Sequence, residues 1–209
     1  MTGSSPFRVL TVCTGNICRS PQAAQLLEAR ISAAGALLSA QVEVSSAGTR
    51  AVLDAGMDPS AAELSRELGG AHGHHRARQL TPPMVDEADL VLCMSREHRS
   101  AAVRMMPRAS RYTFLLTEFA GLLEDFAWNH RADSLWAGSA AEDLPEQLRG
   151  GVRVAARRRG QIPRQVSALA EIVDPHRADV SVYRESAEQI HQAVERICRA
   201  AAGIWESRP

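Results

Sequence analysis

Apolar residues along this chain form short continuous runs and longer stretches with a helical repeat, and the two kinds of segment alternate. The short runs predict strands at 7–13, 42–44, 90–93 and 112–116. The helical repeats predict helices at 20–38, 59–68, between Ser95 and Pro107, and at 182–204. Strands that alternate with helices favour an α/β fold, a single doubly wound domain with a four-stranded parallel sheet flanked by helices.

The stretch at about 118–165 does not follow this alternation. Its first part is acidic (Glu118, Glu124, Asp125, Asp133, Glu142, Asp143, Glu146) and its last part is basic (Arg149, Arg153, Arg157, Arg158, Arg159, Arg164). We interpret it as a partly helical insertion in a domain that spans residues 1–209. The run Arg157–Arg159 is expected to form a solvated face.

Charge and composition narrow the range of functions. The chain has 24 basic and 24 acidic residues, and this zero net charge argues against a general electrostatic grip on nucleic acid. All the basic residues are arginine, which excludes mechanisms that need a lysine amine. We find no apolar run of about 18 residues and no secretory signal at the start, so no membrane span is predicted. Four cysteines without disulfide spacing favour a reducing, cytoplasmic setting.

The loop after the first strand carries the chemistry. Cys13 stands six residues before Arg19, where a strand passes into a helix. The amides of such a loop attract an anion and favour the thiolate of Cys13, while Arg19 can hold two phosphate oxygens. Gly15 is expected to allow a tight turn, Asn16 to lock the loop, and Ser20 to cap the helix and steady the thiolate. The predicted phosphate-binding residues are Thr14, Gly15, Asn16, Ile17, Cys18 and Ser20.

A second cysteine precedes an arginine at the same spacing, Cys93 before Arg99. This segment contains no glycine, places Glu97 where an anion would be repelled, and has Ser95 as an immediate helix cap. We therefore interpret Cys93 as a buried thiol at the end of a strand.

Residues 12–21, Val-Cys-Thr-Gly-Asn-Ile-Cys-Arg-Ser-Pro, resemble the signature of the low-molecular-weight protein tyrosine phosphatases over ten consecutive positions. The resemblance continues at residues 45–49, 75–80, 88–94 and 174–175. It covers about 7–117 and 170–207 of the chain. Residues 56–61 are most similar to the bacterial branch that acts on tyrosine kinases of capsule and exopolysaccharide synthesis.

The resemblance implies a two-step hydrolysis through a cysteinyl-phosphate on Cys13. Asp174, which precedes a proline, is the expected general acid, with Asp143 and Asp179 as alternatives, and Ser46 would support the loop. The implied substrate is a phosphotyrosine protein, with a bacterial tyrosine kinase as the candidate partner. No metal or cofactor is implied, and we expect a monomer or a weak dimer.

The chain departs from the family where aromatic residues line the substrate slot. His176 follows Asp174-Pro175, and residues 50–53 contain no aromatic side chain. Aromatic residues of the insertion either fill this gap or form the insertion's own core (Phe126, Trp128, Trp136). The alternatives of an arsenate reductase, a phosphoarginine phosphatase and a non-catalytic phosphoprotein-binding module therefore stay open. Ile17 resembles the tyrosine-specific pattern, because relatives specialised for phosphoarginine carry a small polar residue there.

Three further features have two interpretations each. Cys18 either fills the loop or traps an oxidised Cys13 as a disulfide. The histidines of residues 72–75 are expected to pack in a loop rather than to bind a metal. The apolar seam of the last helix is expected to pack on the sheet rather than in a coiled coil (Tyr183, Ala187, Ile190, Val194, Ile197, Ala201, Ile204).

Overall fold

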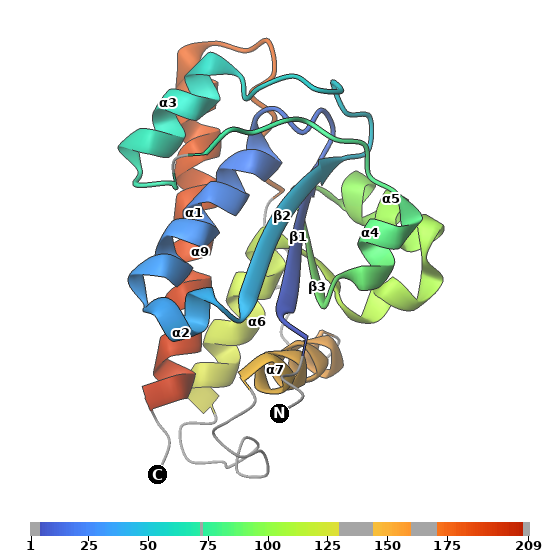
Figure 1. The fold of residues 1–209 in the computed structure, drawn as a ribbon, viewed down its shortest axis with the longest axis vertical. Coiled ribbons are helices and arrows are strands. Elements are labelled where there is room, and N and C mark those ends of the chain that lie inside the picture. The colour runs from blue at the N-terminus through green and yellow to red at the C-terminus, as the bar shows by residue number, and fades with distance from the viewer. Residues whose placement is uncertain (1–4, 72, 130–143, 160–170, 207–209) are drawn as a thin grey trace.

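The centre of the molecule is a four-stranded parallel sheet with the strand order β2-β1-β3-β4 (Figure 1). A computed structural model describes residues 5–71, 73–129, 144–159 and 171–206. The strands are β1 (Phe7–Cys13), β2 (Val42–Gly48), β3 (Leu90–Cys93) and β4 (Thr113–Leu115). The predicted parallel sheet is confirmed, and β2 continues beyond the predicted 42–44 to Gly48.

Helices cover both faces of this sheet, as the alternating pattern predicted. The helices are α1 (Arg19–Ala33), α2 (Ala36–Ser39), α3 (Pro59–Glu67), α4 (Pro82–Glu87), α5 (Arg96–Met105), the 3₁₀-helix η1 (Pro107–Arg111), α6 (Leu116–Asn129), α7 (Leu144–Arg158) and α9 (Val180–Glu206). Helices α1 and α9 lie on one side of the sheet, and α4 and α5 lie on the other (Figure 1). Side chains of α1, α6 and α9 form one core with one face of the sheet, and those of α4, α5 and η1 form another with the opposite face.

The first helix is shorter than predicted. A continuous helix over 20–38 is wrong, because α1 ends at Ala33 and a separate short helix, α2, begins at Ala36. Gly35 lies between them with a φ of 125°, a backbone conformation that an α-helix cannot contain. The short helix α4 was not predicted, since six residues are too few to show a helical repeat.

The last helix lies against α1 and α6, and the buried part of its apolar seam makes this contact. Ile190 and Val194 are fully buried, and Ile197 is nearly so. Packing within the domain is therefore confirmed for this part of the seam. Ala201 is exposed, and the side chain of Ile204 lies outside the described residues. None of the helices in the described ranges has the length and apolar character that crossing a membrane requires.

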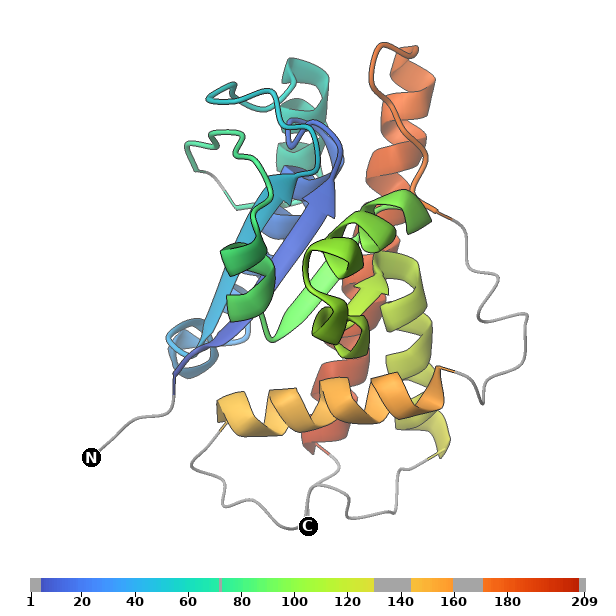
Figure 2. The same ribbon diagram turned by 90° about the vertical axis from the view of Figure 1, so that its right-hand side faces the viewer.

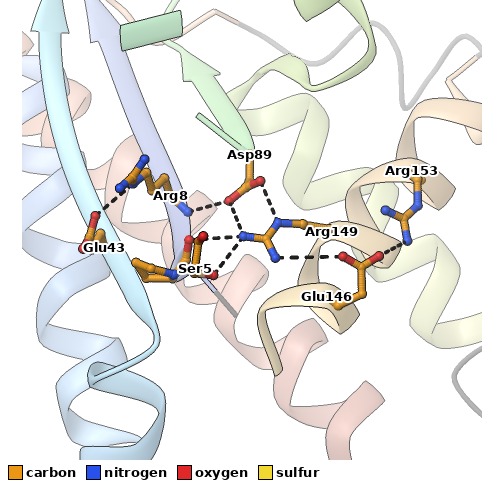
Figure 3. A network of polar contacts seen from close by, with 8 residues as sticks. Ser5, Arg8, Glu43, Asp89, Glu146, Arg149 and Arg153 are labelled. Carbon is orange, nitrogen blue, oxygen red and sulfur yellow. Dashed lines mark hydrogen bonds and ion pairs between the residues drawn. The ribbon is translucent and has the colours of Figure 1, made fainter. Parts of the chain in front are cut away.

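Helix α7 lies across the end of the molecule at which β1 begins (Figure 2). Asp89 fixes it there, because its carboxylate accepts from Nε of Arg149 at 2.8 Å and from the backbone N–H of Arg8 at 2.9 Å (Figure 3). Arg149 also donates to the carbonyl of Ser5 at 3.0 Å. The start of α7 is thus tied to the amino ends of β1 and β3. The division of the chain into a domain and an insertion at 118–165 stays a prediction.

The other end of α7 is held by the arginines that were expected to be solvated. Arg158 pairs with Asp125 at 2.5 Å, and Arg159, just after the helix, pairs with Glu118 at 2.8 Å. The guanidinium of Arg159 also lies 4.1 Å from the ring centroid of Phe114. The prediction of a solvated face was wrong for these two arginines, whose partners come from α6 and β4.

Candidate active site

The loop of residues 14–18 connects the carboxyl end of β1 to α1, and its carbonyls are held from outside. Backbone N–H groups of the segment after β2 donate at 2.9–3.0 Å to three carbonyls of the loop and to that of Cys13 just before it (Thr49 to Cys13, Arg50 to Thr14, Val52 to Gly15, Asp58 to Ile17). In a trans peptide the N–H points away from the C=O, so the loop's N–H groups turn toward the opposite side. The N–H of Asn16 there reaches the sulfur of Cys13 at 3.3 Å. This arrangement suits an anion.

The thiol of Cys13 lies at the centre of this loop and is almost fully buried. Its sulfur is 2.9 Å from Oγ of Ser20. Ser20 was predicted to cap the helix, and that prediction was wrong. α1 begins at Arg19, so Cys18 occupies the cap position, and no side chain caps the helix. The Ser20 hydroxyl lies against the thiol of Cys13 instead of capping. Its second predicted contact, with the thiol, is present.

Asn16 holds the loop in shape. It is fully buried, and its side-chain N–H groups donate to Oγ of Ser20 and Oγ of Ser46, both at 2.9 Å. Its side-chain oxygen accepts from the backbone N–H of Arg78 at 2.9 Å, and its carbonyl accepts from Nε2 of His75 at 2.6 Å. These four bonds support a φ of 56° at Asn16, in the left-handed region.

Gly15 was expected to allow a tight turn, and it lies within the bend over residues 14–18, but it is not the residue with the left-handed backbone. Among the described glycines only Gly35 and Gly69 have a positive φ, and Asn16 takes the left-handed conformation instead. Gly15 is covered by apolar side chains, since a Cβ built there would lie 3.4 Å from Cγ1 of Ile17 and 3.7 Å from Cγ2 of Val52.

Arg19 and Asp174 meet beside the loop although 155 positions separate them in the sequence. The guanidinium of Arg19 is buried, and it pairs with a half-exposed carboxylate, that of Asp174, at 2.5 Å. It also donates to the carbonyl of Ile172 at 3.2 Å. The loop carrying Asp174 is attached to the end of β3, where the carbonyl of Met94 accepts from the N–H of Ile172 at 3.0 Å. The structure therefore brings Cys13, Arg19 and Asp174 to one edge of the sheet.

Of the two alternative acids, only Asp179 lies in the part of the chain that the structure describes. Asp179 is exposed next to the start of α9, and its carbonyl accepts from the N–H of Val182. Asp143 and Trp136 lie outside the described residues, as do the side chains of Phe126 and Trp128. The part of the chain that the structure describes contains no group of three metal-ligating side chains, and His72 is outside it.

The thiols of Cys18 and Cys93 differ from that of Cys13 in their surroundings. Cys18 is held neutral beside the anion site, and Cys93 is buried away from it. Burial, followed by the charge of Asp58, raises the pKa of Cys18 to about 12. Cys93 pairs with Val12 in register and packs with it on the face of the sheet opposite Cys13, where burial raises its pKa. The prediction that Cys93 is a buried strand-end thiol is confirmed by this position.

Three residues of the site were not found by sequence reasoning. His75, Arg78 and His98 contact the loop through hydrogen bonds from distant segments. His75 and Arg78 lie in a stretch that was noticed for a resemblance, and His75 was otherwise expected only to pack in a loop. His98 lies in the segment between Cys93 and Arg99 that was set aside. No local pattern marks such residues, because their partners are 59–84 positions away.

Comparison with known proteins decides the family. The model of the low molecular weight phosphotyrosine protein phosphatases matches residues 8–129, more than half of the chain. This chain belongs to that family.

Its relatives carry two kinds of name. A protein-arginine-phosphatase of Geobacillus stearothermophilus is 39% identical over 114 residues, which cover 54% of this chain and 72% of that protein. A probable low molecular weight protein-tyrosine-phosphatase of Ralstonia nicotianae, EpsP, is 40% identical over 53% of this chain and 70% of that protein. The crystal structure of the Erwinia amylovora tyrosine phosphatase AmsI shares the fold, with a TM-score of 0.62 at 22% identity and 96% of each chain covered.

Proposed function

We propose that this family member hydrolyses phosphotyrosine in proteins through a cysteinyl-phosphate intermediate. The observation that carries the proposal is the loop of residues 14–18, which holds the Cys13 sulfur against the N–H of Asn16 and leads into α1, whose first residue, Arg19, pairs with Asp174. Dipoles and a fixed cation of this kind stabilise both a thiolate and the charge of a transferring phosphoryl group.

In the first step the Cys13 thiolate attacks phosphorus. An S–P bond forms while the bond from phosphorus to the tyrosine oxygen breaks, and Asp174 gives its proton to that oxygen. Arg19 holds equatorial phosphate oxygens with its planar fork. The Asp174 carboxylate pairs with Arg19 at 2.5 Å, so the phosphate of the substrate competes with this carboxylate for the guanidinium.

In the second step water attacks the same phosphorus atom. Asp174, now ionised, takes a proton from the water, the new P–O bond forms and the S–P bond breaks. The thiolate returns, and the hydroxyl of Ser20 at 2.9 Å stabilises it as the leaving group. Inorganic phosphate is the product, and Asp174 is protonated again for the next cycle.

The rim of the loop supports an aromatic leaving group. Ile17 and Val52 lie over Gly15, and Val52 and Leu53 have exposed fractions of 49% and 65%. In this proposal these aliphatic side chains face the leaving group of the substrate, and they favour an apolar ring over a charged guanidine. A second candidate, phosphoarginine, is favoured by the 39% identity to a protein-arginine-phosphatase.

The partner and the location follow from the same proposal. A tyrosine-phosphorylated protein is the substrate, and a bacterial tyrosine kinase of exopolysaccharide synthesis is the candidate partner, supported by the likeness to proteins named EpsP and AmsI. Reaction in the cytoplasm fits a mechanism that needs a reduced thiol at Cys13. The proposed oligomeric state is a monomer or a weak dimer.

The test is phosphate release from a phosphotyrosine peptide under reducing conditions, beside a phosphoarginine peptide. Wild type should prefer phosphotyrosine, Cys13→Ser should release nothing, and Asp174→Asn should be about 10²–10³-fold slower. By calorimetry, Asp174→Asn should bind inorganic phosphate several-fold more tightly, because the carboxylate no longer competes for Arg19. Cys198→Ser, a thiol remote from the loop, is the matched control and should behave as wild type.

Other results would identify the alternatives. Faster release from the phosphoarginine peptide would make the chain an arginine phosphatase. Tight binding of the phosphotyrosine peptide without release would make it a binding module. Thioredoxin-dependent reduction of arsenate would make it a reductase, and activity that survives in Cys13→Ser would overturn the covalent mechanism.

A further inference from the structure

The imidazole of His98, near the start of α5, connects the phosphate loop to the end of β3. His98 has an exposed fraction of only 2%, and both ring nitrogens have a partner. Nε2 lies 2.8 Å from Oγ1 of Thr14, the residue that follows Cys13, and Nδ1 lies 2.9 Å from Oγ of Ser95. The ring thus bridges the cap of α5 and the neighbour of the nucleophile.

A neutral ring satisfies both contacts. Either Nε2–H donates to Thr14 while the Ser95 hydroxyl donates to Nδ1, or Nδ1–H donates to Ser95 while the Thr14 hydroxyl donates to Nε2. In both cases Ser95 Oγ still accepts the backbone N–H of His98 as the helix cap, at 3.4 Å. Every polar atom of the bridge is therefore paired without a charge.

The surroundings keep the ring neutral at physiological pH. Burial and then the charge of Arg19 lower the pKa of His98 to about 4, and Arg50 acts in the same direction. Asp174 and Glu171 oppose this shift and are outweighed. A second cation beside Arg19 is thereby avoided.

We propose that His98 is a positioning residue of the phosphate loop, which acts by holding Thr14 through its hydroxyl. This rests on the function proposed above. Thr14 is fixed from two sides, since its carbonyl accepts from the N–H of Arg50 at 3.0 Å and its side chain contacts His98. Without the contact between Thr14 and His98, the backbone between Cys13 and Asn16 can tilt about the hydrogen bond from Arg50. Small displacements of a reacting group lower the rate of reaction strongly.

The same end of β3 also anchors the acid loop. Met94 accepts from Ile172, and the backbone N–H and guanidinium of Arg96 both donate to the Glu171 carboxylate at 3.2 Å. The junction between β3 and α5 therefore touches both halves of the site, the acid loop through Met94 and Arg96 and the phosphate loop through His98.

The experiment measures inorganic phosphate binding by calorimetry and kcat/KM on a phosphotyrosine peptide. His98→Leu and Thr14→Val each remove one side of the contact and should each weaken phosphate binding about tenfold or more, with a similar loss in kcat/KM. The double variant should bind phosphate no more weakly than the single variant with the larger loss of affinity, because the two residues act through one contact. His98→Gln, which keeps a polar group at similar reach, should restore most of the binding. His74→Leu, an exposed histidine, is the matched control and should match wild type.

Unchanged phosphate binding in His98→Leu would overturn the proposal, and so would losses that multiply in the double variant. If His98→Leu does not fold, Thr14→Val must show the loss by itself and a His98→Gln/Thr14→Val pair must add nothing to it. A wild type that binds phosphate but hydrolyses no phosphotyrosine would refute the proposed function, while the binding comparison would still decide the role of His98.

Discussion

Gly48 occupies the position where the phosphate loop comes closest to the sheet. It pairs with Cys13 in register at the carboxyl end of β2. A Cβ built on Gly48 would lie 2.4 Å from the carbonyl oxygen of Thr14 and 3.0 Å from the backbone N of Asn16. The requirement here is space, because Gly48 has no positive φ and a side chain would collide with backbone that cannot rotate away.

Gly48→Ala should therefore displace the loop and lower kcat/KM on phosphotyrosine peptide by about 10²-fold or more. Gly56→Ala is the matched control, since a Cβ there meets nothing within 4 Å, and it should leave kcat/KM unchanged. Steady-state kinetics of the two variants gives the comparison. Equal rates for both would show that the loop does not need this close approach.

Single residues that use local chemistry were predictable, and those that use distant partners were not. The spacing of Cys13 and Arg19 predicted a loop that the structure contains, and the proline after Asp174 predicted an extended loop position for the acid. The left-handed turn at Asn16 was missed, because it depends on four partners from other segments. For Ser20 the predicted contact with the thiol is present, whereas the predicted helix cap is absent, because α1 begins one residue earlier, at Arg19.

At the scale of elements, complementary charge explains how α7 is placed. The acidic and basic parts of 118–165 were visible in the sequence, but their pairing was not predicted. In the structure Glu118 and Asp125 from α6 meet Arg159 and Arg158 at the end of α7. The basic run Arg157–Arg159 was interpreted as solvated because the sequence does not show which acidic residues it meets. Two of its arginines have partners of opposite charge about 30–40 positions upstream.

The start of α7 offers a test of its anchoring. Arg149 and Asp89, which meet at the amino ends of the strands (Figure 3), are about four-fifths buried. Arg153 and Glu146 are about half exposed. Arg149→Met should lower the free energy of unfolding by about 2 kcal/mol, because the Asp89 carboxylate loses a charged donor. Arg153→Met should change it by less than about 0.5 kcal/mol.

Urea unfolding of the two variants measures both values. The turnover per folded molecule should remain that of wild type in each, since α7 lies at the opposite end of the strands from Cys13. A loss of stability in Arg153→Met as large as that in Arg149→Met would show that the exposed ion pair contributes as much as the buried one.

At the scale of the whole molecule, chemistry and anchoring lie at opposite ends of the sheet. The carboxyl ends of β1 and β2 carry the phosphate loop and its supports, as parallel sheets generally place their ligand sites. The amino ends carry the Asp89 contacts with Arg8 and Arg149. The alternation of strands and helices predicted the first arrangement. The second needed the tertiary structure, because an ion pair between α7 and Asp89, the residue before β3, leaves no periodic pattern in the sequence.

Buried thiols contribute to the loss of this molecule's stability at alkaline pH. Cys18 packs with Ala61, Leu64, Tyr183 and Ala187, and burial is the main cause that raises its pKa to about 12 from an ordinary value of 9.0. The folded state holds the thiol neutral while the unfolded chain ionises it. The stability that Cys18 contributes is therefore complete below about pH 9 and is lost as the pH rises toward 12.

Cys18→Ala should accordingly make the melting temperature fall less steeply between pH 9 and 12 than in wild type. Burial raises the pKa of Cys198 only to about 11, so Cys198→Ala should flatten the same limb by a smaller amount. Thermal melts of the three proteins under reducing conditions, at intervals from pH 7 to 12, measure the slopes. Parallel curves would mean that the Cys18 thiol ionises in the folded state as readily as in the unfolded chain. We expect the melting temperature to fall with pH least steeply in Cys18→Ala, more steeply in Cys198→Ala and most steeply in wild type. This order follows because the slope depends on the difference in bound protons between the folded and unfolded states.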